Sequence, residues 1–412
     1  MQEDIFQNEY MKVTDENETL KIWNYTGPHK EKFYNYRGYI TNLNDELICP
    51  SFGHTEEILS TDVKRLGELN TNNYKWFYSS EGTLCRIFCH EDEWYISTHK
   101  KLSAFASRWS CKYSFGELFV NCLNSLYPDA GENAFEWFCS SLKKDEVYYF
   151  LLRCNSQNRI ICNVTNLKDF ERCLYIGKFS NGKYNLNTGN DDVELLNKFS
   201  KSVEVSLDDG KSIVEKSEAV DPFVYQGLIG FNTTQENGIH VIKLLNSEYK
   251  NWMTVRGNNP NLRFRYLEIR RNPEMVEKLY NLYPRYSDMF DDFEEIIFKL
   301  ARKIYSAYID RYIKNKYITL PKEEYILLKR CHDWFLKDKA NNKIFARKVL
   351  EFLNEETPFN LYKMIKRHQN VQREAINFLD GEKEKHFFKG LEQTMLNEEA
   401  NGICLVENEA SN

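Results

Sequence analysis

A change of patterning near residue 260 constrains the fold of this 412-residue chain more than any other feature. Before that point, short alternating or continuous apolar runs are separated by Asn, Asp, Gly and Ser, a pattern typical of strands joined by turns. After Pro260, apolar residues recur at helical spacing and glycines are few. The sequence therefore predicts an α+β protein, with an antiparallel-sheet domain first and an α-helical domain after it.

Local signals place the individual elements. Hairpins are expected where two strand-like runs flank a polar turn: 33–40 with 46–49, 84–88 with 94–98, and 147–152 with 159–164. Further strands are expected at 223–231 and 239–245. Helical spacing predicts helices at 114–126, 132–142, 193–206, 274–283, 291–315, 322–337, 343–354 and 361–379. We therefore predict a first domain at 1–265, a helical domain at 266–396 and an acidic, flexible tail at 397–412.

Composition narrows the class of protein. A formal net charge of -6 and a pI of about 5.9 argue against a protein that coats nucleic acid by bulk charge, so nucleic-acid binding would need local patches. The 11 cysteines include no CxxC pair, which favours reduced thiols and no structural metal site. The chain begins without a signal-peptide pattern and has no apolar window of about 20 residues. We expect a cytoplasmic, soluble protein without a membrane segment, in an oligomeric state that the sequence leaves open.

Five short segments stand out by their residue types and their order. They are Arg37-Gly38, Ser79-Ser80-Glu81-Gly82-Thr83, Asn158-Arg159-Ile160-Ile161, Gln226-Gly227-Leu228-Ile229 and the run from Lys243 to Tyr249. Together they resemble motifs of the covalent nucleotidyltransferase superfamily, and within it the phage-type RNA ligases and their relatives in large DNA viruses. The resemblance implies an antiparallel nucleotidyltransferase-like domain followed by a helical C-terminal domain. It implies ATP or GTP as the ligand, Mg²⁺ if the enzyme is active, and RNA or a protein as the partner.

The chain departs from this family where charge carries the chemistry. In the family, a lysine amine attacks the α-phosphorus of the nucleotide, and carboxylates hold the divalent metal. Ser79 occupies the lysine position, Leu152 and Gln226 occupy two glutamate positions, and Leu245 replaces one of two late lysines. The catalytic residues are therefore unknown, and no metal ligands are predicted.

The residues expected to bind follow from the same resemblance and from local charge. Those expected to contact nucleotide are Glu81, Gly82, Arg159, Gln226 and Lys243. Those expected to contact RNA are Lys100, Lys101, Arg263, Arg265 and Arg271, because basic side chains cluster there and a continuous strand would place the three arginines on one side.

Three functions are compatible with the sequence. The first is a pseudoenzyme that binds nucleotide or RNA ends without lysine adenylylation. The second is an active, diverged ligase whose nucleophile comes from elsewhere, for example Lys75, Lys100 or Lys101. The third is an unrelated α+β structural or interaction protein, for which the order of the five segments would be coincidence. Whether the chain is an enzyme is left open, with the lost charges favouring the first function.

Overall fold

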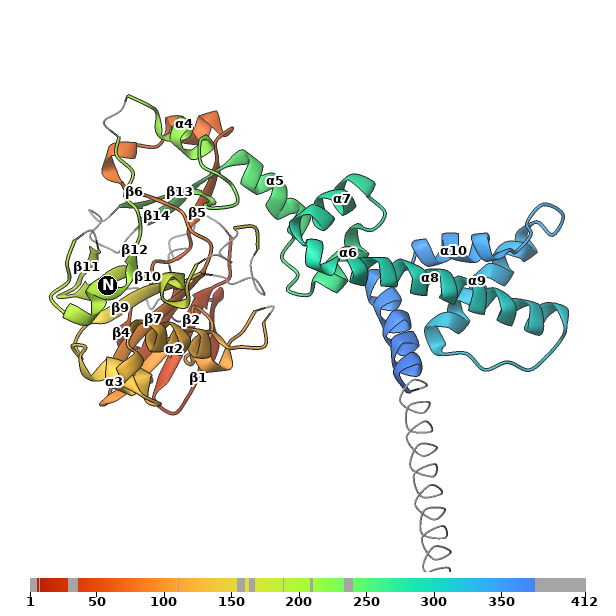
Figure 1. Cartoon of the computed structure of the whole chain (residues 1–412), viewed down its shortest axis with the longest axis horizontal. Coiled ribbons are helices and arrows are strands. Elements are labelled where there is room, and N and C mark those ends of the chain that lie inside the picture. Colours follow the sequence, from red (N-terminus) through yellow and green to blue (C-terminus); the bar gives the residue numbers. More distant parts are fainter. Residues whose placement is uncertain are drawn as a thin grey trace, which may run out of the picture. The chain divides into compact units, whose positions relative to one another are not determined.

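The structure is a computed structural model that describes residues 6, 8–28, 36–109, 111–153, 160–162, 167–187, 189–207, 210–232 and 240–374 (Figure 1). The chain divides into two units, unit 1 (Met1–Asn261) and unit 2 (Leu262–Asn412). Unit 1 holds the strands and unit 2 is helical, so the predicted α+β class with a helical C-terminal part is confirmed. The predicted tail, 397–412, lies outside the described residues. In the part of the chain that is described, no helix is both long and apolar enough to cross a membrane.

The described part of unit 1 contains three sheets. The first has the order β1-β2-β3-β4, made of Met11–Glu16, Leu20–Tyr25, Arg37–Asn42 and Leu47–Cys49. The second has the order β11-β10-β9-β7-β8 with β12 beside β10, made of Lys183–Leu186, Cys173–Ser180, Val147–Leu152, Thr83–His90, Glu93–Ser97 and Ser200–Lys201. The third has the order β5-β14-β13-β6, made of Glu56–Leu59, His240–Leu245, Gly227–Asn232 and Lys75–Tyr78. Neighbouring strands are antiparallel except β10 with β12 and β14 with β5.

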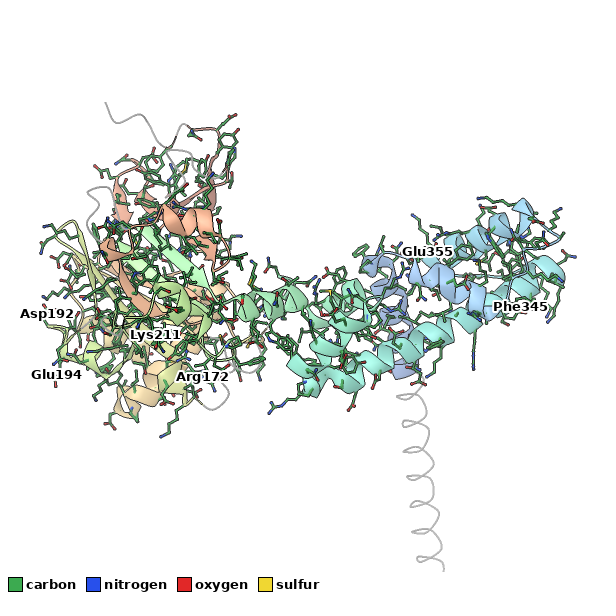
Figure 2. All side chains as sticks on the ribbon, turned by 90° about the horizontal axis from the view of Figure 1, so that it is seen from above. Arg172, Asp192, Glu194, Lys211, Phe345 and Glu355 are labelled. Carbon is green, nitrogen blue, oxygen red and sulfur yellow. The ribbon has the colours of Figure 1, made fainter. Side chains whose placement is uncertain are left out.

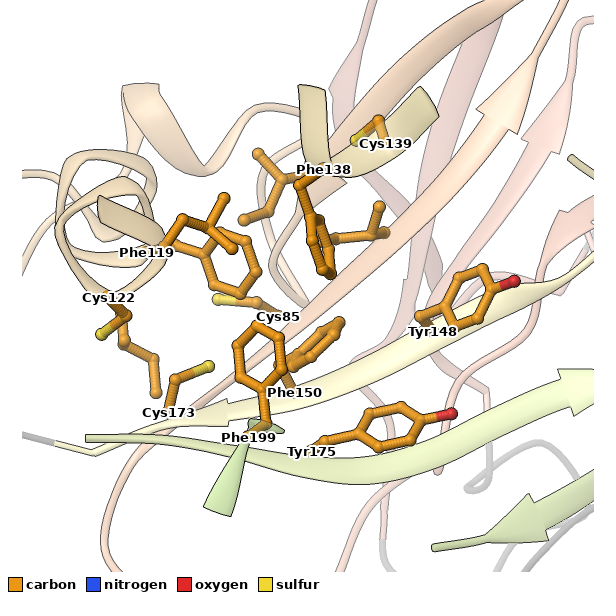
Figure 3. Close-up of a cluster of buried hydrophobic side chains, with 14 of the residues drawn as sticks. Cys85, Phe119, Cys122, Phe138, Cys139, Tyr148, Phe150, Cys173, Tyr175 and Phe199 are labelled. Carbon is orange, nitrogen blue, oxygen red and sulfur yellow. The ribbon is translucent and has the colours of Figure 1, made fainter. Parts of the chain in front are cut away.

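Alternation along β7 and β9 gives the second sheet two apolar faces. Cys85, Ile87, Tyr148 and Phe150 pack under helices α2 (Phe115–Leu126) and α3 (Ala134–Ser140), in the cluster that Figure 3 shows. Phe88 and Tyr149 point the other way, into a core shared with the first and third sheets. Successive side chains of a strand alternate between faces, so β9, which is apolar throughout, is buried on both sides, and the buried middle of β7 includes the charged Arg86.

The remaining helices of unit 1 are short. They are α1 (Val63–Gly67), α4 (Ile213–Glu218) and α5 (Ser247–Arg256), with 3-10 turns at Thr71–Asn73, Ala104–Ala106, Pro128–Ala130, Asp169–Arg172 and Glu194–Lys198. Helix α2 begins with a capping box in which Ser114 and Glu117 exchange side-chain and backbone hydrogen bonds. The predicted helices 114–126 and 132–142 are therefore confirmed, with small shifts at their ends.

The hairpin predictions divide into two groups. The pairs β3–β4 and β7–β8 form as antiparallel hairpins, as predicted. The pairing of 147–152 with 159–164 is wrong, because β9 pairs with β7 and β10 instead. Residues 160–162 are not in a strand, and their backbone N–H groups bind a side chain, Glu81, rather than β9.

The helix predicted at 193–206 is also wrong. A 3-10 turn, Glu194–Lys198, is followed by the short strand β12, which pairs in parallel with β10. Val193, Leu196 and Phe199 are buried within and beside this turn. Their spacing of three matches the three residues per turn of a 3-10 helix, which is why an apolar pattern in this segment does not produce an α-helix.

Unit 2 is a set of helices packed around α8. They are α6 (Leu262–Ile269), α7 (Pro273–Leu282), α8 (Ser287–Tyr308), a π-helical turn (Ile309–Ile313), α9 (Lys322–Lys337), α10 (Ala346–Asn354) and a helix over 358–374. The interior is formed by apolar side chains from α8, α9 and α10, among them Phe293, Ile297, Leu300, Leu327, Leu328, Val349 and Leu353. The guanidinium of Arg270 pairs with Glu294 through two hydrogen bonds of 2.7 Å and also reaches Asn354.

Candidate functional site

A cavity of about 410 Å³ lies in unit 1, where the second and third sheets face each other beside the Ser79–Gly82 turn. The acidic and basic residues of its lining are Arg37, Glu57, His99 and Lys243. Apolar side chains form much of the remaining wall, among them Phe52, Tyr78, Leu151, Ile176, Ile229, Phe231 and Val241. A mostly apolar cavity with a few convergent polar groups is the usual form of a small-ligand site.

The side chains of Ser79, Gln226 and Lys243 meet at one atom. Both the Ser79 hydroxyl and the Lys243 ammonium donate to Oε1 of Gln226, at 3.2 Å and 2.9 Å. Strand pairing fixes this meeting point, because the backbones of Ser79, Gln226 and Gly227 are joined by two hydrogen bonds across β6 and β13. The order of segments along the sequence thus corresponds to a real convergence in space.

Gln226 is connected to Glu81 through the hydroxyl of Tyr249. Its Nε2 donates to the Tyr249 hydroxyl at 3.0 Å, and that hydroxyl donates to Glu81 Oε1 at 2.7 Å. The Tyr249 hydroxyl has one proton and donates it to Glu81, so its contact with residue 226 requires a donor on that residue. Residue 226 must therefore donate to the tyrosine and also accept hydrogen bonds from Ser79 and Lys243. An amide meets both requirements and a carboxylate does not.

The Glu81 carboxylate is occupied by the protein itself. It accepts backbone N–H groups from Ile160, Ile161 and Cys162, at 2.9 to 3.3 Å, in addition to the Tyr249 hydroxyl. Burial raises the pKa of Glu81, and these four donors oppose that shift by favouring the carboxylate. Glu81 is 2% exposed and is not among the cavity-lining residues, so it acts as an anchor for the wall.

Two glycines allow the backbones to approach closely beside the turn. A Cβ on Gly82 would lie 2.6 Å from the Leu152 carbonyl oxygen, and one on Gly227 would lie 2.2 Å from that of Leu244. Gly227 also has a φ of 133°, which other residues rarely adopt. Both glycines are therefore required by the geometry of the strands around the cavity.

The pKa values of Lys243 and His99, two basic side chains of the cavity wall, are both lowered. Surrounding protein lowers the pKa of Lys243 by desolvation, although solvent reaches the side chain through the cavity and Glu57 and Glu81 oppose the shift. Burial lowers the pKa of His99 well below its usual value, and the positive charges of Arg37 and Arg86 act in the same direction. His99 is therefore neutral at pH 7, and its Nε2 is buried without a hydrogen-bond partner in the described part of unit 1.

The structure brings some of the predicted nucleotide-binding residues together. Gly82 and Lys243 line the cavity, as does Ser79, while Glu81 and Gln226 are buried next to it. Arg159 lies outside the described residues. Leu152, aligned with a metal-binding glutamate, belongs to the helix-covered core and is not among the lining residues, so that position would not present a carboxylate to the cavity.

The predicted RNA-binding residues lie elsewhere. Lys100 is exposed, and Lys101 pairs with Asp15 at 2.8 Å; both follow β8. Placing the arginines on one strand is wrong, because Arg263 and Arg265 belong to helix α6 and Arg271 follows it. Arg265 pairs with Glu268 at 2.9 Å. A role of these side chains in RNA binding stays a prediction.

Several cavity residues carry no sequence signal. Phe52, Gly53, Thr55 and Glu57 come from the segment that enters β5, where no motif stands out. Glu57 could have been found only from its pairing with Lys243 across β5 and β14. Among the described residues, no group of three or more His, Cys, Asp or Glu side chains is arranged to hold a metal ion.

Comparison with known proteins gives relatives from iridescent viruses and frog virus 3. No family model matches the chain. The immediate-early protein ICP-46 homolog of Invertebrate iridescent virus 6 is 26% identical over 301 residues, which is 70% of this chain and 65% of that protein. The homolog from Invertebrate iridescent virus 3 is 28% identical over 300 residues, 70% and 61% of the two chains. Immediate-early protein ICP-46 of Frog virus 3 is 28% identical over 209 residues, 46% and 49%.

All three of these relatives are viral proteins. The chain spans less than two thirds of the length of each of these relatives.

Two solved structures are similar at low TM-score. A putative ATP-dependent DNA ligase from Aquifex aeolicus has a TM-score of 0.34 at 12% identity, covering 70% of this chain and 77% of that one. An archaeal ATP-dependent RNA ligase has a TM-score of 0.35 at 10% identity, covering 87% and 76%.

Proposed function

We propose that this chain is a ligase-like protein that binds a nucleotide, or the nucleotide at an RNA end, in the cavity of unit 1 without forming a lysine adenylate. The observation that carries the proposal is the shared contact of Ser79 and Lys243 with Gln226 Oε1. It puts a cationic amine at the cavity wall and a hydroxyl without a basic partner at the position where the family has its nucleophile.

The hydroxyl of Ser79 is poorly suited to attack a phosphate. A serine needs an adjacent general base, and the acceptor of its hydrogen bond is an amide oxygen. Ser79 is also 1% exposed. The carboxylate of Glu81 is saturated by internal donors, which leaves it no free lone pair for a cation. Both features favour binding over covalent chemistry.

The cavity is suited to a nucleotide in shape and charge. Arg37 and Lys243 supply positive charge for phosphate oxygens, and the apolar wall with Phe52 and Tyr78 suits a base. Glu57 is the one acidic residue of the lining described here, so we expect binding that does not depend on Mg²⁺. If Mg²⁺ binds with the nucleotide, Glu57 would be its protein ligand.

The nucleophiles considered for a diverged active enzyme are not at the cavity. Lys75 is exposed and lies 3.8 Å from Glu204, and neither it nor Lys100 or Lys101 is among the cavity-lining residues. Lys243 is the lysine that lines the cavity in the part of unit 1 described here.

Equilibrium binding and covalent labelling test the proposal together. ATP and GTP are titrated by calorimetry with and without EDTA, and α-labelled ATP is incubated with protein before a denaturing gel. We expect binding that survives EDTA, no labelled band, and a loss of affinity of about tenfold or more in Lys243→Met, since a hydrogen bond to a charged group contributes about 1.5–3 kcal/mol. Lys75→Met is the matched control and should bind like the unaltered protein.

Two results would contradict the proposal. If neither ATP nor GTP binds, the cavity is not a nucleotide site. A labelled band that disappears in Lys243→Met would show covalent chemistry at Lys243, and the chain would then be an active, diverged nucleotidyltransferase.

A further inference from the structure

A second group of chemically distinctive side chains lies in unit 2, where α8 ends. The helix continues into the π-helical turn Ile309–Ile313 before the chain leads to α9. Such turns occur often at functional sites because they re-aim side chains that an α-helix would place elsewhere. Here the turn carries Arg311 and Tyr312.

One face of α9 receives these two side chains. Tyr325, Lys329 and His332 follow one another at spacings of four and three residues, so they lie on one side of the helix. The Arg311 guanidinium lies 5.3 Å from the ring centre of Tyr325 and 5.5 Å from that of Tyr312. The Tyr312 ring stacks on His332 at 3.7 Å with an angle of 8° between the planes. Together these residues form what we call the α8–α9 surface: Arg311, Tyr312, Tyr325, Lys329 and His332.

The two cations of this surface, Arg311 and Lys329, contact aromatic rings instead of carboxylates. Neither Arg311 nor Lys329 has a carboxylate within ion-pairing distance in the described part of the chain; their close neighbours are aromatic rings. Two acids of α9 are engaged away from this surface, Glu323 with Arg367 and Glu324 with Lys303, while the third, Asp333, follows His332 and forms no ion pair with Arg311 or Lys329 in the described part of the chain. Among the described residues, no ion pair neutralises the charge of Arg311 or Lys329 on the α8–α9 surface.

The surrounding sequence has the same excess of positive charge. Residues 309–343 contain nine Lys or Arg against five Asp or Glu, in a chain that has 55 against 61 overall. Some of these cations are paired, such as Arg330 with Glu355, whose position Figure 2 labels. Tyr317 and Ile313 lie close by in sequence and are 92% and 64% exposed. The segment thus combines local positive charge with exposed aromatic and apolar side chains.

We propose that the α8–α9 surface binds single-stranded nucleic acid. Arg311 and Lys329 would contact phosphates, and Tyr325 and Tyr312 with the guanidinium plane of Arg311 would stack against bases. Cations held against rings favour this ligand over an acidic peptide, which has carboxylates but no bases to stack. The inference does not depend on the cavity of unit 1, so either can fail alone.

Fluorescence anisotropy tests it in the full chain. The probe is a labelled oligouridylate of about 20 nucleotides, longer than a usual site, with the matching oligodeoxythymidylate as a second arm. The test variant is Arg311→Gln with Lys329→Gln. The matched control is Lys278→Gln with Lys299→Gln, which removes the same charge from two cations paired with Glu274 and Glu295 on their own helices. Thermal melting confirms that each variant is folded.

The expected result is a loss of affinity of tenfold or more in the test variant and a change below about twofold in the control, since each phosphate contact contributes strongly at low salt. The slope of log K against log salt should fall by about 1.4, the value for two lost contacts to a single strand. Tyr325→Leu should weaken binding by about fivefold or more without changing that slope, because stacking carries no counterion release.

Three outcomes would overturn the proposal. Absence of binding to both oligonucleotides removes the surface as a nucleic-acid site. Equal losses in the test and control variants would mean that unit 2 attracts the probe by net charge alone. Competition by polyglutamate as strong as that by unlabelled oligouridylate would identify the ligand as an acidic protein segment. Equal binding of the RNA and DNA arms supports the proposal, because stacking and phosphate contact do not distinguish them.

Discussion

The Tyr249 hydroxyl donates a 2.7 Å hydrogen bond to Glu81, although 168 positions separate the two residues in the chain. Through this bond, helix α5 is attached to the Ser79–Gly82 turn and to the backbone of Ile160–Cys162. The wall of the cavity therefore depends on a buried carboxylate that no ligand need touch.

Removal of the Glu81 carboxylate should be costly. Glu81→Ala removes the carboxylate that accepts three backbone N–H groups and the Tyr249 hydroxyl, and we expect a loss of at least about 3 kcal/mol in the free energy of unfolding. Tyr249→Phe removes one donor to a charged group and should cost about 1.5–3 kcal/mol. Urea unfolding of unit 1 measures both. A Glu81→Ala variant no less stable than Tyr249→Phe would contradict the anchoring role.

Replacement of Gln226 by glutamate should destabilise the protein instead of restoring a catalytic group. Gln226→Glu removes the donor to the Tyr249 hydroxyl while placing a second carboxylate near Glu81. A buried unsatisfied group costs about 1–3 kcal/mol. The new carboxylate would also raise the pKa of Lys243, whose ammonium lies 2.9 Å from this position. Unfolding curves and NMR titration of Lys243 check these two effects. A variant of unchanged stability would show that the amide is not needed.

His99 should make unit 1 sensitive to mild acid. Its pKa in the folded protein is well below 6.5, the value it regains on unfolding, so the unfolded state binds the proton more tightly. The contribution of neutral His99 to stability is present in full above pH 6.5 and is lost as the pH falls below 6.5 towards the folded pKa. The loss is at most about 1.4 kcal/mol per pH unit.

The measurement for His99 is a comparison of stabilities. Urea unfolding between pH 7.5 and pH 5, a range from about 1 unit above to about 1.5 units below the unfolded pKa, should show a smaller decline in His99→Gln than in the unaltered protein. Other acid-sensitive groups contribute equally to both proteins, so the difference isolates His99. Parallel declines would mean that His99 accepts a proton in the folded state.

Gly82 should not tolerate a methyl group. Gly82→Ala would bring the new Cβ to 2.6 Å from the Leu152 carbonyl oxygen and 2.8 Å from Leu151, in the strand pair that forms the cavity wall. Overpacking of this kind costs about 1–3 kcal/mol. Gly67→Ala is the control, because a Cβ there meets nothing within 4 Å. Thermal unfolding of both variants gives the comparison, and equal melting temperatures would be incompatible with the close approach at Gly82.

The parts of the fold that the sequence predicted are those fixed by neighbouring residues. The β7–β8 hairpin follows from alternation around a short polar turn, and α2 from apolar spacing with Ser114 as its cap. The partners of β9 could not be predicted, because a run that is apolar on both faces fits any register and its partners are distant in sequence.

The candidate site shows the same division. Ser79, Gly82, Gln226 and Lys243 were found from the order of the motif segments, and they converge. The function of Glu81 as an anchor was missed, because its partners at 160–162 are backbone N–H groups, which almost any residue supplies. The sequence also gives no sign that the Gln226 amide oxygen accepts hydrogen bonds from both Ser79 and Lys243, because this contact depends on the fold.

The attachment of α5 to the Glu81 turn also has a consequence for biosynthesis. A nascent chain presents Ile160–Cys162 to Glu81 first, and Lys243 and Tyr249 emerge later. The cavity therefore gains Lys243 and its last anchoring bond in the same stretch of synthesis, between β14 and α5. A fragment that ends before Ser247 would contain every strand of the three sheets and still lack that bond, so we expect it to be less stable than the whole of unit 1.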